Sequence, residues 1–258
     1  MNQYFDISRF LQLPVLASKH GKDVDTLIIW VHWLMIALFI GWIVFFFYAI
    51  FRFRKSKNSK ADYTGAKTHA STYIEVAVAA VEGVLLFALA IPLWAKAVDK
   101  FPSEKEATVI RVVAEQFTWN SRYPGPDGVF GKQDIKLLTS ANPLGYVDGD
   151  AQGQDDRTPN PKDIHAPVDK PVIIHLTSKD VIHSLQLDPM RITQDAIPGM
   201  SIPLHFTPTK VGQYQIQCAQ LCGSGHATMD GVFTVDTAEN YEKWLAEKTK
   251  TGGPVSFE

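Results

Sequence analysis

The sequence predicts a protein of two parts, a membrane-spanning helical hairpin followed by a small all-β domain outside the membrane. Three observations lead to this fold class. Two long apolar runs lie in the first 98 residues, basic residues are concentrated between them, and the rest of the 258-residue chain consists of short β-type runs broken by Gly, Pro and Asp. We therefore expect an outer N-terminal segment at 1–26, a hairpin at 27–98 and an outer domain at 99–258.

The two apolar runs are long enough to cross a bilayer. Residues 27–51 form 25 residues without Lys, Arg, Asp or Glu, and residues 74–95 are nearly as apolar over 22 residues. A helix needs about 20 such residues to cross the hydrocarbon core, so we expect spans at about 27–53 and 74–97. Trp94 lies where an interfacial aromatic residue is expected. A soluble helical hairpin is disfavoured because a large partner would have to cover two apolar helices.

The loop between the runs predicts the orientation of the hairpin. Asp62 is its one acidic residue, against six basic residues: Arg52, Arg54, Lys55, Lys57, Lys60 and Lys67. Such clusters stay on the cytoplasmic side, which places both termini and the outer domain outside. The N-terminal segment before the first apolar run is charged, and no cleavage site follows closely, so we expect an uncleaved anchor in the bacterial inner membrane. The lack of an Arg- and Ser-rich presequence argues against a mitochondrial location.

Charge is distributed unevenly along a nearly neutral chain. The whole sequence has 25 basic and 27 acidic residues, which argues against nucleic-acid binding. Residues 99–258 carry 15 Lys and Arg against 21 Asp and Glu, whereas residues 1–98 carry 10 against 6. The outer domain is therefore acidic and suited to a basic partner.

Short β-type runs indicate a β-sandwich or barrel beyond residue 101. The predicted strands are 108–113, 117–119, 171–177, 202–206, 213–217 and 231–235. Residues 138–168 are rich in Gly, Pro, Asp and Asn and predict a long surface loop. A final helix is expected at 237–249, with Thr237 as its N-cap.

The segment from 218 to 229 contains two thiols, an imidazole and a thioether: Cys218, Cys222, His226 and Met229. Sulfur ligands favour copper, and the thioether favours it over a structural zinc ion. A disulfide between the two cysteines is the alternative, but it would leave His226, Met229 and the intervening glycines without a shared purpose. A two-copper site needs a second imidazole, and His183, at a strand end, is the candidate.

These residues, together with the two spans, the segment from Gln116 to Gly128 and the segment from Asp195 to Gly199, resemble subunit II of cytochrome c oxidase. The resemblance implies a cupredoxin-like Greek-key barrel or sandwich that carries a dinuclear CuA centre. It implies that Cys218 and Cys222 bridge both coppers, that His183 and Met229 complete one copper, and that His226 and the main-chain carbonyl of Gln220 complete the other. No open coordination position is expected, so the site is suited to electron transfer.

Gln220 departs from the family pattern, in which a Glu at this position also helps to hold magnesium at the contact with the catalytic subunit. A neutral amide supplies no charge to a hard cation, so Gln220 argues against this second metal.

The resemblance also concerns aromatic and acidic side chains. The family typically has an aromatic pair after the glutamine, and its first tryptophan receives electrons from cytochrome c; here the pair is Phe117 and Trp119. We expect Trp119 to receive the electron and Phe117 to be its neighbour, with core filling as the alternative for Phe117. Glu75 matches the glutamate at the mouth of a proton path, although a solvated helix-end acid is an equal alternative. Glu82 lies deeper in the span and has no family role that we can assign.

The resemblance implies an electron-input subunit that is not catalytic alone. It would accept electrons from cytochrome c, or from a cytochrome domain of an associated complex, and pass them to haem. The haem and CuB would lie in subunit I, where oxygen is reduced to water with proton translocation, and other oxidase subunits and membrane lipid complete the surroundings. The alternatives are a membrane-anchored copper-binding or copper-delivery module and a quinol-oxidase-type subunit II, which characteristically lacks these copper ligands.

Overall fold

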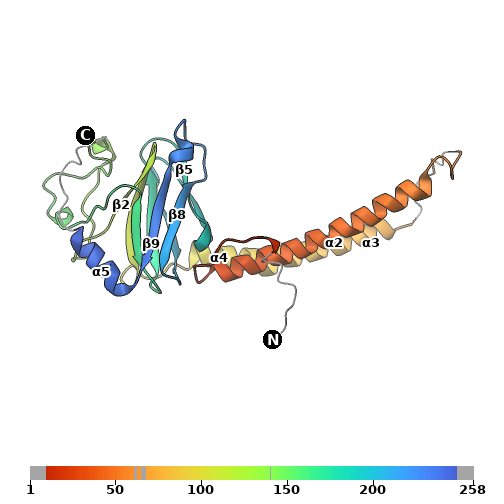
Figure 1. Ribbon diagram of the computed structural model, residues 1–258, viewed down its shortest axis with the longest axis horizontal. Coiled ribbons are helices and arrows are strands. Elements are labelled where there is room, and N and C mark those ends of the chain that lie inside the picture. Colours follow the sequence, from red (N-terminus) through yellow and green to blue (C-terminus); the bar gives the residue numbers. More distant parts are fainter. Residues whose placement is uncertain (1–9, 61–62, 65–67, 140, 249–258) are drawn as a thin grey trace. The chain divides into compact units, whose positions relative to one another are not determined.

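The computed structural model describes residues 10–60, 63–64, 68–139 and 141–248, which form two compact units (Figure 1). One unit contains Asp23–Lys96. The other joins Pro14–Lys22 to the chain from Ala97 onward. The first nine residues of the expected outer segment 1–26 and residue 249 of the expected final helix lie outside the described residues.

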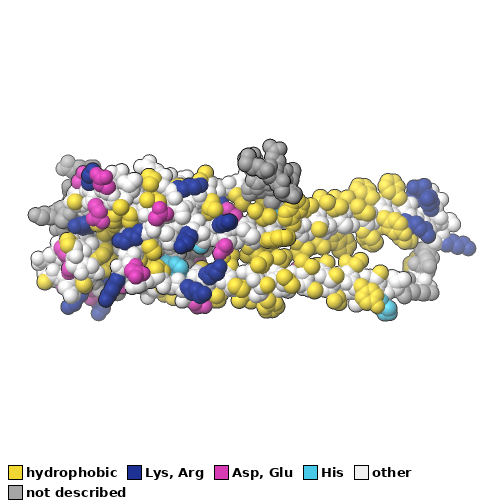
Figure 2. Space-filling view, turned by 90° about the horizontal axis from the view of Figure 1, so that it is seen from below, with side chains coloured by type: hydrophobic (Ala, Val, Ile, Leu, Met, Phe, Trp, Pro, Cys, Tyr) yellow, Lys and Arg dark blue, Asp and Glu magenta, His cyan; other side chains and the backbone are white. Residues whose placement is uncertain are grey.

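The first unit is a helical hairpin. Helix α2 (Gly21–Phe53) is followed by α3 (Ala70–Val84), a π-helical stretch η1 (Leu85–Ala90) and α4 (Ile91–Asp99). The stretches Gly21–Phe53 and Ala70–Asp99 are both long and apolar enough to cross a membrane, and their most apolar windows are not buried. Figure 2 shows hydrophobic side chains along both helices, with basic side chains at the loop end. Such continuous apolar exposure requires lipid or protein to cover it.

The second unit is a β-sandwich of two sheets. Its strands are β1 (Thr108–Glu115), β2 (Thr118–Arg122), β3 (Asp163–Pro167), β4 (Val172–Ser178), β5 (His183–Leu187), β6 (Ile192–Ala196), β7 (Ile202–Phe206), β8 (Gly212–Cys218) and β9 (Asp230–Asp236). One sheet has the order β2-β1-β4-β7, and the other has the order β3-β9-β8-β5-β6. The pairs β1–β4 and β3–β9 are parallel, which requires the chain to cross between the layers. This mixed two-layer sandwich has the cupredoxin-like architecture.

The core lies between the sheets and is formed by side chains that alternate along the strands. Its fully buried members include Ile110, Ile174, Leu176, Leu185, Ile216 and Phe233. Short 3₁₀ turns occur outside the strands at η2 (Ile135–Leu137), η3 (Ala151–Gly153), η4 (Asp188–Met190) and η5 (His226–Thr228).

The strand predictions are right in the regular parts of the domain, miss three strands and start β2 one residue early. β7 has the predicted bounds, and β1, β4, β8 and β9 overlap their predicted runs. β3, β5 and β6 were not predicted, and β3 corrects the loop expected at 138–168, because its residues pair in parallel with β9. β2 begins at Thr118, so Phe117 lies in the turn before it.

The final helix α5 (Ala238–Glu247) is confirmed, with Thr237 as its N-cap: the side-chain oxygen of Thr237 accepts a hydrogen bond from the Asn240 amide at 3.3 Å. It packs against β3 and β9 (Figure 1). The Trp244 ring stacks on His165 of β3 with ring centroids 4.0 Å apart, and it also meets Tyr123 edge-on.

The segment Pro14–Lys22 belongs to the sandwich unit. The Ala17 amide donates to the carbonyl of Pro189 at 2.8 Å, the Lys19 amide donates to Thr207, and the Thr209 amide donates to Ala17. Ala17 is fully buried. The expected boundary at residue 26 therefore differs from the structure, because main-chain hydrogen bonds attach part of the lead to the outer domain.

Candidate metal centre

The predicted metal donors converge because they lie at strand ends or in the connection that follows. His183 is the first residue of β5, and Cys218 is the last residue of β8. These strands are antiparallel neighbours, with Leu185 opposite Cys218, so the two donors meet at the same end of the sheet. Cys222 lies in the loop after β8, and the turn η5 brings His226 and Met229 back towards β9.

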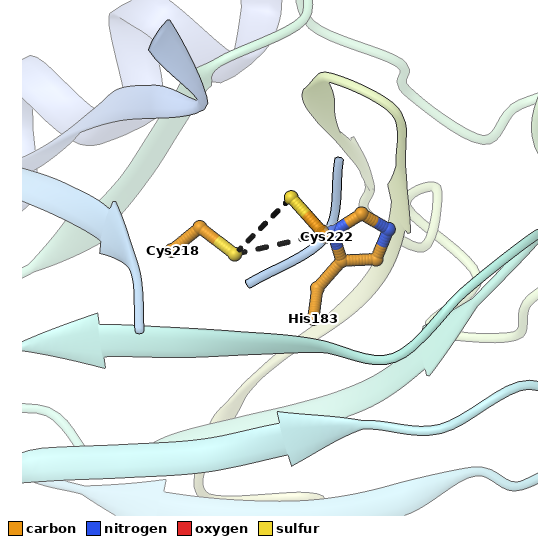
Figure 3. A group of neighbouring side chains, drawn as sticks. All are labelled: His183, Cys218 and Cys222. Carbon is orange, nitrogen blue, oxygen red and sulfur yellow. Dashed lines mark hydrogen bonds between the residues drawn. The ribbon is translucent and has the colours of Figure 1, made fainter. Parts of the chain in front are cut away.

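The donor atoms lie at ligand-like separations. The Sγ atoms of Cys218 and Cys222 are 3.9 Å apart, and Nδ1 of His183 is 3.9 Å from Sγ of Cys218. Figure 3 shows both sulfurs and this imidazole directed towards one another. Nδ1 of His226 lies 3.5 Å from Sγ of Cys222, and Sδ of Met229 lies 3.7 Å from the same sulfur.

The residues fit a copper site by both spacing and chemistry. The ligand atoms of His183, Cys218 and Cys222 all lie within 4.8 Å of one another. Metal–ligand bonds of about 2.0 to 2.3 Å put two donors on one ion roughly 3 to 4 Å apart, which matches the distances around Cys222. The donor set of thiols, imidazoles and a thioether is the soft set that copper favours.

The site is largely shielded from water. His183 is fully buried, and Met229 and Cys222 are 1% and 4% exposed. Burial and the neighbouring Cys218 thiol raise the pKa of Cys222 to about 11. Both cysteines are free thiols in this structure, so binding a metal as thiolates must release protons.

The main-chain carbonyl of Gln220 faces the same sulfur that His183 faces. Its oxygen lies 3.2 Å from Sγ of Cys218, whereas the residue as a whole is exposed. The carbonyl oxygen can therefore serve as a metal ligand whatever the side chain at this position is. The exposed side-chain amide of Gln220 can then face a partner.

The structure places Trp119, which we expect to receive the electron, inside the sandwich. Trp119 is fully buried, and its ring lies 6.3 Å from the His183 ring, inside the sandwich. A surface donor cannot contact it directly. Phe117 is half-buried instead, and its ring covers the cysteine loop: a Cβ atom at Gly225 would approach a Phe117 ring carbon to 2.4 Å.

Sequence reasoning did not identify the residues that support the metal loops. Lys162 donates from Nζ to the Thr228 carbonyl and to Asp230 Oδ1, both at 2.9 Å, so it holds the residues on either side of Met229. Asp180, three residues before His183, contacts that imidazole at 2.8 Å. The position of Asp180 just before a predicted His ligand could have indicated its role. No sequence pattern indicated the role of Lys162.

The two membrane acids lie on the outside of the hairpin. Glu75 and Glu82 are both exposed on α3, and their seven-residue separation puts them on one helix face. The structure does not connect either residue with the metal centre.

The sandwich and its sulfur and imidazole donors define a membrane-anchored, cupredoxin-like copper-binding protein. A family model described as cytochrome c oxidase subunit II, periplasmic domain, matches residues 148–235. The alternative cytochrome c oxidase subunit 2 of Bradyrhizobium diazoefficiens is 30% identical over 241 residues, which cover 92% of this chain and 84% of that protein. The chain belongs to the cytochrome c oxidase subunit II family, whose members are components of an oxidoreductase complex.

Two further comparisons give similar results. Cytochrome c oxidase subunit 2 of Synechocystis sp. is 28% identical over 258 residues, covering 91% of this chain and 75% of that protein. Among solved structures, the periplasmic domain of cytochrome oxidase subunit II from Bradyrhizobium japonicum is similar, with 25% identity, a TM-score of 0.42, and coverage of 57% of this chain and 95% of that domain.

Proposed function

We propose that this chain is the electron-input subunit of a haem-copper oxidase, accepting electrons from cytochrome c at a dinuclear CuA centre and passing them to haem in subunit I. There oxygen would be reduced to water with proton translocation. The observation that carries the proposal is the convergence of the predicted donors around Cys218 and Cys222.

In this proposal two coppers would be held by Cys218 and Cys222 together with His183, Met229, His226 and the main-chain carbonyl of Gln220. Such a centre would supply one-electron transfer with little movement of its ligands. The chain's own contribution is to hold the six donors in place and to exclude water, and the burial of His183, Cys222 and Met229 supports this role.

Phe117 is the residue we assign to the electron-accepting surface. Its half-buried ring lies against Gly225 of the cysteine loop, and the buried Trp119 lies against His183. Six excess negative charges between residues 99 and 258 suit a basic cytochrome c, or a cytochrome domain of an associated complex, as the donor.

The location we propose is the bacterial inner membrane, with the copper domain on the periplasmic side and the basic loop in the cytoplasm. Glu75 then lies near the cytoplasmic end of its helix, where it serves as the mouth of a proton path. A Glu75→Ala variant should slow turnover without changing copper content. Unchanged turnover would remove Glu75 from the path.

The test of the central proposal is copper content together with electron paramagnetic resonance on the full-length chain purified in detergent. Two coppers that share one unpaired electron are expected. One copper with a localised signal would contradict the CuA assignment and would favour a copper-delivery module, the alternative from a different functional class. Failure to bind copper would favour a quinol-oxidase-type subunit.

A further inference from the structure

A carboxylate outside the donor set contacts the buried imidazole. Oδ1 of Asp180 lies 2.8 Å from Nε2 of His183. A carboxylate can only accept at its ionised oxygens, so the proton of the neutral imidazole resides on Nε2 and the lone pair on Nδ1. Nδ1 is the atom that faces Sγ of Cys218. The contact therefore sets both the tautomer and the direction of the metal-binding nitrogen.

Asp180 is itself held by the main chain. Oδ1 accepts from the Val181 amide at 2.7 Å, and Oδ2 accepts from the Gln116 amide at 2.8 Å. A carboxylate with fixed oxygens gives His183 less rotational freedom than a solvated one would.

Gln116 extends these contacts to the cysteine loop. Its side-chain Nε2 donates to the carbonyl of Cys222 at 2.5 Å, while its main-chain amide donates to Asp180. One residue of the β1–β2 turn thus connects the His183 loop with the Cys222 loop. Neither Asp180 nor Gln116 offers a donor to the metal site.

We propose that Asp180 is a positioning residue that orients His183 for copper, and that Gln116 couples this orientation to Cys222. The inference rests on the proposed copper function and specifies how that site is preorganised. Hydrogen bonding of this kind to a ligating His typically changes metal affinity by about 10- to 100-fold.

Asp180 is also partly exposed, with 30% of its side chain accessible, so a role as a surface charge for donor docking has to be separated from positioning. Two substitutions do this. Asp180→Asn and Asp180→Ala remove the same charge and the same acceptor for the Gln116 main-chain amide, but the Asn amide oxygen still accepts from Nε2 of His183, whereas Ala offers no acceptor.

The experiment uses the full-length chain in detergent, loaded with copper. Copper retention is measured by titration with a competing chelator, and the environment of the metal by electron paramagnetic resonance. We expect Asp180→Ala to lose about 10-fold or more in copper affinity and to show an altered spectrum, and Asp180→Asn to recover most of both properties. Gln116→Ala keeps the main-chain bond to Asp180 and loses only the contact with Cys222, so its loss should be smaller.

Each outcome decides between the proposals. A wild-type chain without two coppers and a shared electron contradicts the proposed function itself. A wild-type chain with that signature, but with Asp180→Ala equal to it in affinity and spectrum, overturns the positioning role alone. Equal losses in the Asn and Ala variants also overturn it, because they would follow the charge and not the acceptor. Circular dichroism of each metal-free variant shows whether the sandwich is folded.

Discussion

Replacing His165 with Phe should release the C-terminal helix α5 from the sandwich. Nδ1 of His165 lies 2.6 Å from Asp236 Oδ2, and Nε2 lies 2.9 Å from Asp163 Oδ1, while the ring stacks on Trp244. Burial opposes protonation, but hydrogen bonds and charges from the two carboxylates outweigh it and raise the pKa of His165. The protonated ring, with both nitrogens donating, therefore links β3 to β9 beneath the helix.

The size of the stability loss on His165→Phe follows from these contacts. Hydrogen bonds to charged groups contribute about 1.5 to 3 kcal/mol each. The freed carboxylates regain water, since the side chains of Asp163 and Asp236 are 32% and 18% exposed, and Phe keeps the stacking on Trp244. We therefore expect a net loss of about 2 kcal/mol, which corresponds to roughly 30-fold faster opening of α5 at pH 6.

The pH dependence has a defined sign. Because the folded-state pKa of His165 is raised, its contribution is complete below the unfolded pKa of about 6.5 and is lost as pH rises through the folded value. The hydrogen bond from His165 lowers the pKa of Asp163. The stabilising contribution of the Asp163 carboxylate is therefore present above about pH 3.9 and is lost as pH falls through the folded-state pKa. The difference in α5 hydrogen-exchange rate between wild type and His165→Phe should therefore become smaller at alkaline pH.

Hydrogen exchange of the α5 amides, measured by mass spectrometry and corrected for intrinsic rates, checks this prediction. His175→Phe is the matched control, because His175 contacts one exposed carboxylate, Glu104, at 3.3 Å. That control should change stability by less than about 1 kcal/mol. Equal exchange in wild type and His165→Phe at pH 6, or an equal effect of the control, would refute the reasoning.

Three further outcomes are expected. Phe117→Leu should slow reduction by cytochrome c about tenfold, equivalent to about 1.4 kcal/mol in barrier, at unchanged copper content; an unchanged stopped-flow rate would remove this ring from the electron-accepting surface. Lys162→Met should speed hydrogen exchange in the turn before Met229 by about fivefold, since exposed ion pairs contribute at most about 1 kcal/mol, and no change would show that Lys162 does not hold that turn. Arg122→Met should cost about 3 to 5 kcal/mol in urea unfolding, because it leaves the buried carboxylate of Asp156 without its partner; a loss below 1 kcal/mol would contradict this.

The donor set could be predicted because its chemistry is concentrated in the sequence. Cys218, Cys222, His226 and Met229 lie within twelve residues, and a short loop can bring them together whatever the rest of the fold does. His183 is 35 residues upstream of Cys218, and no local rule predicts their contact. Its place at an expected strand end made it a candidate, the family resemblance implied its role as a ligand, and the pairing of β5 with β8 provides the physical reason for the contact.

Phe117 and Trp119 differ in burial because they belong to different elements. The sequence predicts one strand at 117–119, in which residues 117 and 119 would share a face. The strand begins at Thr118, so Trp119 lies within it and is buried in the core, while Phe117 lies in the turn with its ring against Gly225 of the cysteine loop. The missed strands β3, β5 and β6 are stabilised by pairing with neighbouring strands, which a local sequence pattern does not report.

The end of the sandwich that holds the metal donors is formed by three connections, and one of them supplies no donor. The β4–β5 loop leads to His183, and the β8–β9 loop follows Cys218 and carries Cys222, whereas the β1–β2 turn contributes Gln116 and Phe117. That turn nevertheless contacts both of the others, through the amide of Gln116 and through the ring of Phe117 against Gly225. Glycine is required at 225 because the ring occupies the space of a side chain there. The β1–β2 turn therefore limits how far the two donor-bearing loops can move apart, which is the property that a site with small reorganisation on electron transfer needs.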